Sequence, residues 1–60
     1  MLNIWLTDAE SAIAIDAVSP VLACTLKAMR NTSQPNAYGQ RLFKLTPKQW
    51  GEITLATPGI

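Results

Sequence analysis

The residue types that most often carry catalysis or metal binding are scarce in this sequence. Among its 60 residues there are no histidines, one cysteine and four carboxylates. Three of the carboxylates, Asp8, Glu10 and Asp16, occur within nine residues, at positions expected to cap or cover a helix. Cys24 lies in the most apolar segment, where a cysteine is usually an inert core residue. We therefore predict no catalytic residue, no metal site and no cofactor, and a protein that is not an enzyme.

Side chains suited to binding are easier to find. Trp, Tyr and Arg are the types most enriched among binding hot spots, because they combine a large contact area with a polar group. Strand alternation directs Trp5 and Leu42 to the outer face of a small sheet, while Tyr38 lies in a polar loop. The predicted partner-binding residues are Trp5, Tyr38, Arg41 and Leu42. In the alternative, Trp5 is a core residue that the C-terminal element covers.

The first residues predict a strand that runs straight into a helix. Residues 2–6 are short, aliphatic and aromatic, and alternation places Leu2, Ile4 and Leu6 on one face. Thr-Asp-Ala-Glu at residues 7–10 matches a capping box, in which a threonine hydroxyl and a glutamate carboxylate bond each other's backbone amides. The acidic side chains also suit the positive end of the helix dipole.

The segment from residue 8 to residue 30 has a helical pattern that is apolar on nearly every side. Ser19-Pro20 reads as an N-cap followed by proline at the first helical position, so we predict two helices, or one sharply kinked, divided near Ser19. One two-stranded sheet is too small to cover residues 12–29 on all their apolar sides. With neither a disulfide framework nor a metal to stabilise so short a chain, we expect self-association.

In the second half of the chain, a loop is followed by another strand that leads into a capping box. Residues 31–40 have a loop composition, and residues 41–45 predict a second strand. Thr-Pro-Lys-Gln at residues 46–49 matches a second capping box with proline at the first helical position. The sequence is compatible with either a helix or a strand as the final element. Trp50 and Ile53 suit a helix face, whereas the alternation of residues 52–57 suits a strand that forms a hairpin with residues 41–45.

Charge is divided along the chain. Residues 1–26 carry three acidic side chains and no basic one, whereas residues 27–60 carry all five basic side chains and one acidic one. Such a division suits either a basic patch for an acidic partner or two halves that attract each other in a dimer. The first residues lack the basic start of a secretory signal, and the longest apolar stretch is interrupted by charges and a proline. We therefore expect a cytoplasmic protein without a membrane span.

Two functions are compatible with these observations. The first is a small non-enzymatic protein-binding module, of the inhibitor or adaptor type, whose partners are itself and another protein. The second is a dimeric DNA-binding regulator, because a strand and two helices follow the element order of ribbon-helix-helix repressors. The outward strand residues Asn3, Trp5 and Thr7 include no base, which departs from what phosphate attraction requires. We predict an α+β fold in a single domain over residues 1–60, in the order β-α-α-loop-β-α, and favour the first function.

Overall fold

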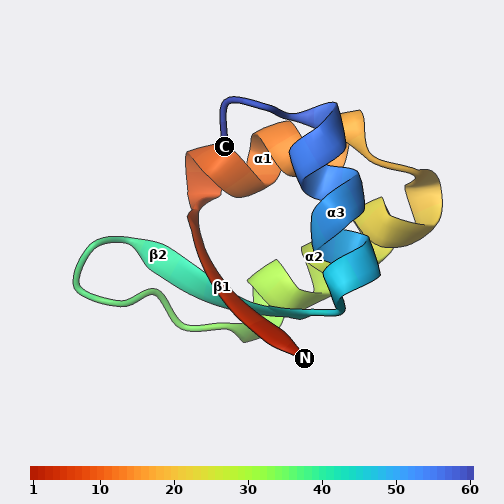
Figure 1. The fold of residues 1–60 in the computed structure, drawn as a ribbon. Helices are drawn as coiled ribbons and strands as arrows, with labels where there is room; N and C mark the ends of the chain where they lie inside the picture. Colours follow the sequence, from red (N-terminus) through yellow and green to blue (C-terminus); the bar gives the residue numbers. More distant parts are fainter.

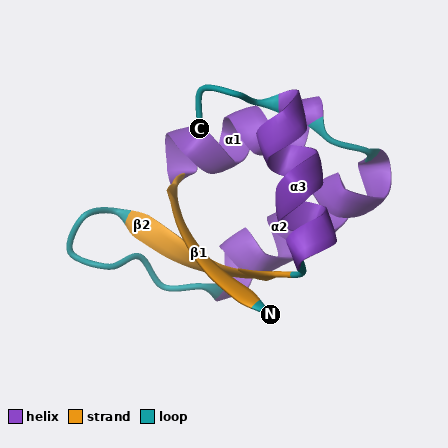
Figure 2. Ribbon diagram, in the orientation of Figure 1, coloured by secondary structure: helices purple, strands orange, loops and turns teal.

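Two strands and three helices follow one another in the order predicted from the sequence (Figure 1). The computed structural model describes all 60 residues. The elements in chain order are β1 (Leu2–Thr7), α1 (Asp8–Ala17), α2 (Pro20–Thr32), β2 (Gln40–Leu45) and α3 (Pro47–Ala56). The strands form one two-stranded antiparallel sheet, and the helices gather to one side of it (Figure 2). The α+β class is confirmed, and the open question about the final element is settled as a helix.

Both predicted capping boxes are present. At the start of α1, the Thr7 hydroxyl accepts from the Glu10 amide at 3.1 Å, and the Thr7 amide donates to Glu10 Oε1 at 2.9 Å. Thr46 and Gln49 make the same two hydrogen bonds at the start of α3, at 3.1 and 2.9 Å. Each box satisfies amides that a helix start would otherwise leave without partners, so each strand passes directly into a helix.

The predicted division near Ser19 separates α1 from α2. Ser19 is the N-cap of α2, its hydroxyl accepts from the Leu22 amide, and Pro20 occupies the first turn. The Ser19 amide donates to Glu52 Oε2 at 2.8 Å, which joins this corner to α3. The turn therefore serves as a tertiary contact as well as a helix break.

The core lies between the sheet and the helices. Its buried apolar residues come from all five elements: Leu6, Ala14, Leu22, Leu26, Phe43, Leu45 and Ile53. In α3, Ile53 is fully buried and Trp50 packs against this cluster, whereas Gly51 and Glu52 are exposed. Inward positions three residues apart fit the helical period, so packing overrides both the alternation of residues 52–57 and the low helix propensity of Gly51.

The predicted loop is shorter than its composition suggested. Asn31 and Thr32 belong to the last turn of α2, and Gln40 opens β2, so the loop covers residues 33–39. Asn36 organises it, because its Oδ1 accepts from the amides of Tyr38 and Gln40, each at 2.9 Å. Gly39 has a φ of 73°, a left-handed conformation that glycine adopts without steric cost.

Several apolar side chains of the helices stay outside the core. Ile13 is 54% exposed and Val21 is 80% exposed, in the segment whose apolar sides were expected to exceed what one sheet covers. Cys24 is also exposed, so the expectation that it is a core residue is wrong. The reason is helical geometry, since Leu22 and Leu26 take the inward positions of α2 and the residue midway between them faces outward. None of the three helices is long and apolar enough to cross a membrane.

Candidate binding surface

The strand register places Trp5 directly opposite Leu42. Asn3 pairs with Lys44 and Thr7 with Gln40, so these three pairs share one side of the sheet. We call this side the outer sheet face and define it by six residues: Asn3, Trp5, Thr7, Gln40, Leu42 and Lys44. Trp5 is 46% exposed on it. An apolar cross-strand pair therefore lies at the centre of a face that is otherwise polar.

The outer sheet face is open because the core uses the other side of the same strands. Leu6, Phe43 and Leu45 point inward and are buried. The C-terminal helix was the candidate to cover Trp5, but its inward side chains, Trp50 and Ile53, pack with the core. Strand alternation then leaves Trp5 on the opposite side, as predicted from the sequence. Trp5 is partly accessible for this reason.

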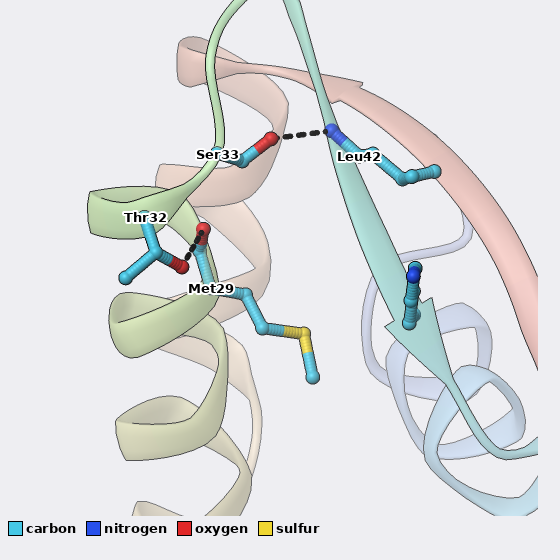
Figure 3. A pocket seen from close by; sticks show the side chains of 5 residues that line it. Met29, Thr32, Ser33 and Leu42 are labelled. Carbon is cyan, nitrogen blue, oxygen red and sulfur yellow. Dashed lines mark hydrogen bonds between the residues drawn. The ribbon is translucent and has the colours of Figure 1, made fainter.

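A groove runs between the C-terminal end of α2 and β2. Its lining residues are Met29, Thr32, Ser33, Leu42 and Lys44, and its volume is about 380 Å³. The Met29 side chain extends from α2 toward β2, and the Ser33 hydroxyl accepts from the Leu42 amide at 3.0 Å (Figure 3). Sequence reasoning did not select Met29 or Lys44. Alternation with Leu42 would have indicated Lys44, whereas only the tertiary structure brings Met29 to the groove.

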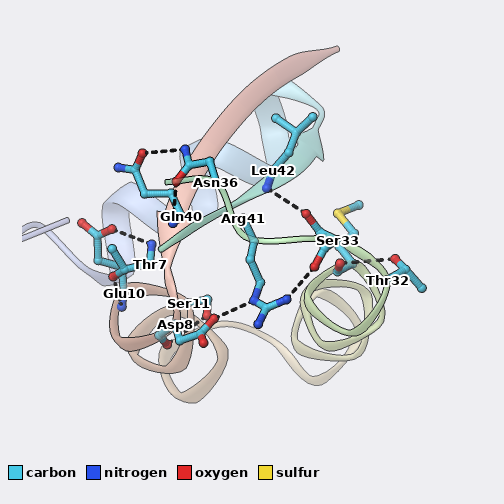
Figure 4. Close-up of polar contacts among 11 residues, drawn as sticks. Thr7, Asp8, Glu10, Ser11, Thr32, Ser33, Asn36, Gln40, Arg41 and Leu42 are labelled. Atoms are coloured by element: carbon cyan, nitrogen blue, oxygen red, sulfur yellow. Dashed lines mark hydrogen bonds and ion pairs between the residues drawn. The ribbon is translucent and has the colours of Figure 1, made fainter. Parts of the chain in front are cut away.

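Arg41 lies on the other side of the sheet from Trp5 and Leu42. It is opposite Leu6 in the register, and Figure 4 shows Arg41 and Leu42 leaving β2 in opposite directions. Arg41 Nε lies 2.8 Å from Asp8 Oδ1, and Nη1 donates to the Ser33 carbonyl. The guanidinium thus connects the first turn of α1 to the end of α2. The structure does not bring Arg41 together with the other predicted binding residues.

Arg41 also lines a second, polar cleft of about 330 Å³. The remaining lining residues are Asp8, Arg30 and Asn31. The Arg41 side chain is 25% exposed and that of Asp8 is 64% exposed, so solvent screens their ion pair. A pair of this kind contributes at most about 1 kcal/mol to stability. Its main effect is to orient the guanidinium toward α1.

Tyr38 lies at the far end of the loop and is 83% exposed. Tyr38 therefore does not pack against the body of the protein. Its amide is held by Asn36 Oδ1, and the loop projects away from the helices before it enters β2 at Gln40 (Figure 1). Tyr38 thus extends beyond the Gln40 end of the outer sheet face.

Comparison with known proteins does not assign this chain to a family. No family model matches the chain, and no curated protein or solved structure matches it. Within the chain, no group of three or more His, Cys, Asp or Glu side chains is placed to hold a metal ion. The first strand, which in a ribbon-helix-helix element order would pair with another subunit, pairs here with β2 of its own chain. The geometry of the outer sheet face is therefore the basis for a functional proposal.

Proposed function

We propose that this chain is a small, non-enzymatic, cytoplasmic protein-binding module of the inhibitor or adaptor type that acts as a homo-oligomer. The outer sheet face makes the contact. The observation that carries the proposal is the 46% exposure of Trp5 beside Leu42, on the side of the sheet that faces away from the core. The exposed thiol of Cys24 suits a reducing compartment, where a single cysteine remains a thiol.

The energetics favour a partner for this face. Covering the exposed part of a tryptophan contributes about 2 kcal/mol, and aromatic anchors of this type dominate binding energies. Leu42 supports Trp5 from the neighbouring strand, and Lys44 adds a charged rim that would help to select partners. A central apolar pair with polar surroundings is the usual composition of a protein interface.

The size of the core favours self-association. Only nine of the 60 residues are buried, and they include seven apolar side chains. A domain this small covers a modest part of its surface, so contact with a second copy adds stability that the core alone does not supply. Ile13 and Val21 provide further exposed apolar area outside the sheet.

The experiment that tests the proposal is sedimentation velocity at micromolar concentration, with Trp5→Ala as the variant. Leu55→Ala is the matched control, because Leu55 is 86% exposed and lies on α3. We expect the wild type to sediment above its chain mass of 6.5 kDa, Trp5→Ala to remain folded but shift toward monomer, and Leu55→Ala to behave as the wild type. A wild type that stays monomeric, or a Trp5→Ala protein that associates normally, would refute the proposal.

The DNA-binding alternative is distinguished by salt. Binding to duplex DNA weakens steeply as salt is added, because phosphate contacts release counterions. An apolar contact centred on Trp5 and Leu42 changes little over the same range. We expect no salt-sensitive complex between the wild type and a random-sequence duplex in a gel-shift titration. A complex that forms in the nanomolar range and dissociates with salt would support the alternative.

A further inference from the structure

The second edge of β1 has no strand beside it, because the sheet contains only β1 and β2. The direction of the backbone groups follows from one hydrogen bond. The Leu42 amide donates to Ser33, outside the sheet, so the Trp5–Leu42 pair is one whose backbone groups point away from the partner strand. The same holds two residues away for Asn3 and Lys44. Asn3 and Trp5 therefore direct two N–H and two C=O groups toward the open edge of β1.

The two edges of the sheet differ in how they are protected. At the edge of β2, the Ser33 hydroxyl accepts a hydrogen bond from the Leu42 amide, and the end of α2 lies beside the strand. Arg41 and Lys44 add positive charge to β2. On β1, the residues from Leu2 to Thr7 include no charged residue and no proline. Proteins usually shield an edge strand with charge, proline or a covering element, because an unshielded edge pairs with other strands. Only the β1 edge is unshielded.

We infer that the open edge of β1 pairs with β1 of a second copy, antiparallel and about a two-fold axis that passes beside Ile4. In this register, Asn3 of each copy lies opposite Trp5 of the other. The four outward groups of each copy then form four hydrogen bonds between the subunits. On the inner side, Ile4 meets Ile4, and Leu2 of one copy meets Leu6 of the other. This pairing covers Leu2 and Ile4, which are only partly buried in the single chain.

A second copy fits this edge better than an unrelated strand or another edge of the same protein. The β1 sequence is uncharged, so two copies meet without like-charge repulsion. Pairing of β1 with β2 of the next copy would propagate without closing, and the shielding of β2 opposes it. Pairing between two β1 edges closes at two subunits.

The inference rests on the proposed homo-oligomer and places its contact where the outer sheet face meets the open edge of β1. There the Trp5 side chain of each copy lies beside Asn3 of the other, so truncation of Trp5 weakens the same contact. A four-stranded sheet in the order β2-β1-β1-β2 would carry two copies of the outer sheet face on one continuous surface. In one row across that sheet, Leu42 and Trp5 of one subunit would be followed by Asn3 and Lys44 of the other. A partner would therefore meet two tryptophans and two lysines related by the two-fold axis.

Amide hydrogen exchange of the wild type, followed by NMR at several protein concentrations, tests the inference directly. In the dimer, we expect the amides of Asn3 and Trp5 to exchange at least about tenfold more slowly than the amide of Lys44, which points out of the other edge. On dilution to a monomer, as judged by sedimentation, the three amides should exchange at similar rates. A dimer in which Asn3 and Trp5 exchange as fast as Lys44 would place the interface elsewhere. A chain that is monomeric at every concentration would overturn both this interface and the proposed homo-oligomer.

Chemical synthesis of the chain with a single N-methylated backbone amide provides the matched variants. N-methylation of Asn3 removes an outward N–H without altering the outer sheet face, and N-methylation of Lys44 does the same on the β2 edge. We expect the first to weaken dimerisation at least about tenfold, since each dimer loses two hydrogen bonds, and the second to leave it unchanged. A folded N-methyl-Asn3 chain that dimerises normally would refute the edge pairing and leave the proposed function standing. Loss of dimer in this chain, together with normal association of Trp5→Ala, would refute the role of the outer sheet face and leave the edge pairing standing.

Discussion

The chain contains two strand-to-helix units, β1-α1 and β2-α3. They share the same connection between strand and helix but differ in what the strand contacts. Both pass from a strand into a helix through a threonine capping box, with matching hydrogen-bond lengths of 2.9 and 3.1 Å. In the second unit, Phe43 and Leu45 are fully buried and the strand edge is shielded. In the first unit, Trp5 is nearly half exposed and the strand edge is open.

This difference shows that the same capping box can follow a strand that packs in the core or a strand that is free to contact another molecule. The capping box determines where a helix begins, whereas the residues that precede it determine what the strand does. The second strand is anchored at both ends, by the loop around Asn36 and by α3. The first strand has no element beside its second edge, so that edge remains for another molecule, together with the outer sheet face that both strands share.

The largest expected effect separates the two strands by stability. Phe43→Ala should lower the free energy of unfolding by about 3–5 kcal/mol, enough to unfold a protein this small, because Phe43 is fully buried. Trp5→Ala should cost roughly 1–2 kcal/mol in dilute solution, since only part of its side chain is covered. Urea denaturation followed by circular dichroism measures both. Equal losses at the two positions would assign Trp5 to the core and remove it from the contact surface.

The caps should have similar and smaller effects in the two units. Thr7→Ala and Thr46→Ala should each lower the free energy of unfolding by about 1 kcal/mol, because each removes the acceptor of one helix-start amide. The sequence alone left the second value open, since it depends on residues 47–56 being helical. The same denaturant titrations provide the measurement. Negligible losses at both positions would mean that neither box stabilises its helix.

The charges of the first helical turns differ between the units and offer a finer test. α1 has Asp8 and Glu10 in its first turn, whereas α3 has no acidic residue there and carries Lys48. Lys48→Glu should therefore stabilise the protein by about 0.3–1 kcal/mol at low salt through the helix dipole. The gain should shrink as salt is added, which thermal unfolding at two ionic strengths would show. A salt-independent gain would point to helix propensity instead.

The smallest expected effect concerns the ion pair that links the two units. Asp8→Asn should lower the free energy of unfolding by less than about 1 kcal/mol, because Asp8 is 64% exposed and solvent screens its contact with Arg41. It should also leave association unchanged, since Arg41 lies on the inner side of the sheet. Sedimentation of Asp8→Asn checks the second point. A loss of association would bring the polar cleft into the contact surface.

Prediction from the sequence succeeded where the signal was local. The capping boxes involve residues three apart, and the break at Ser19 and Pro20 involves neighbours. Strand alternation correctly placed Trp5 on the side away from the core, because it depends only on the geometry of extended backbone. The positions of Tyr38 and Leu42 followed from the same local arguments.

Prediction failed where the position of a side chain depends on its packing and contacts in the folded protein. Cys24 was expected inside, but Leu22 and Leu26 fill the inward side of α2. Arg41 was predicted to be part of the binding surface because in the chain it adjoins both Leu42 and the loop that carries Tyr38. Its partner in the fold is Asp8, 33 residues away, and no local pattern indicates such a contact.

The sequence by itself determined where most elements begin and which side of β1 faces outward, because those properties depend on hydrogen bonds and steric preferences between near neighbours. The tertiary structure alone decided that residues 47–56 form a helix, that Met29 meets Leu42 across a groove, and that β2 has a shielded edge while β1 has an open one. These outcomes depend on which apolar side chains share one small core. That competition is settled only when all five elements pack together.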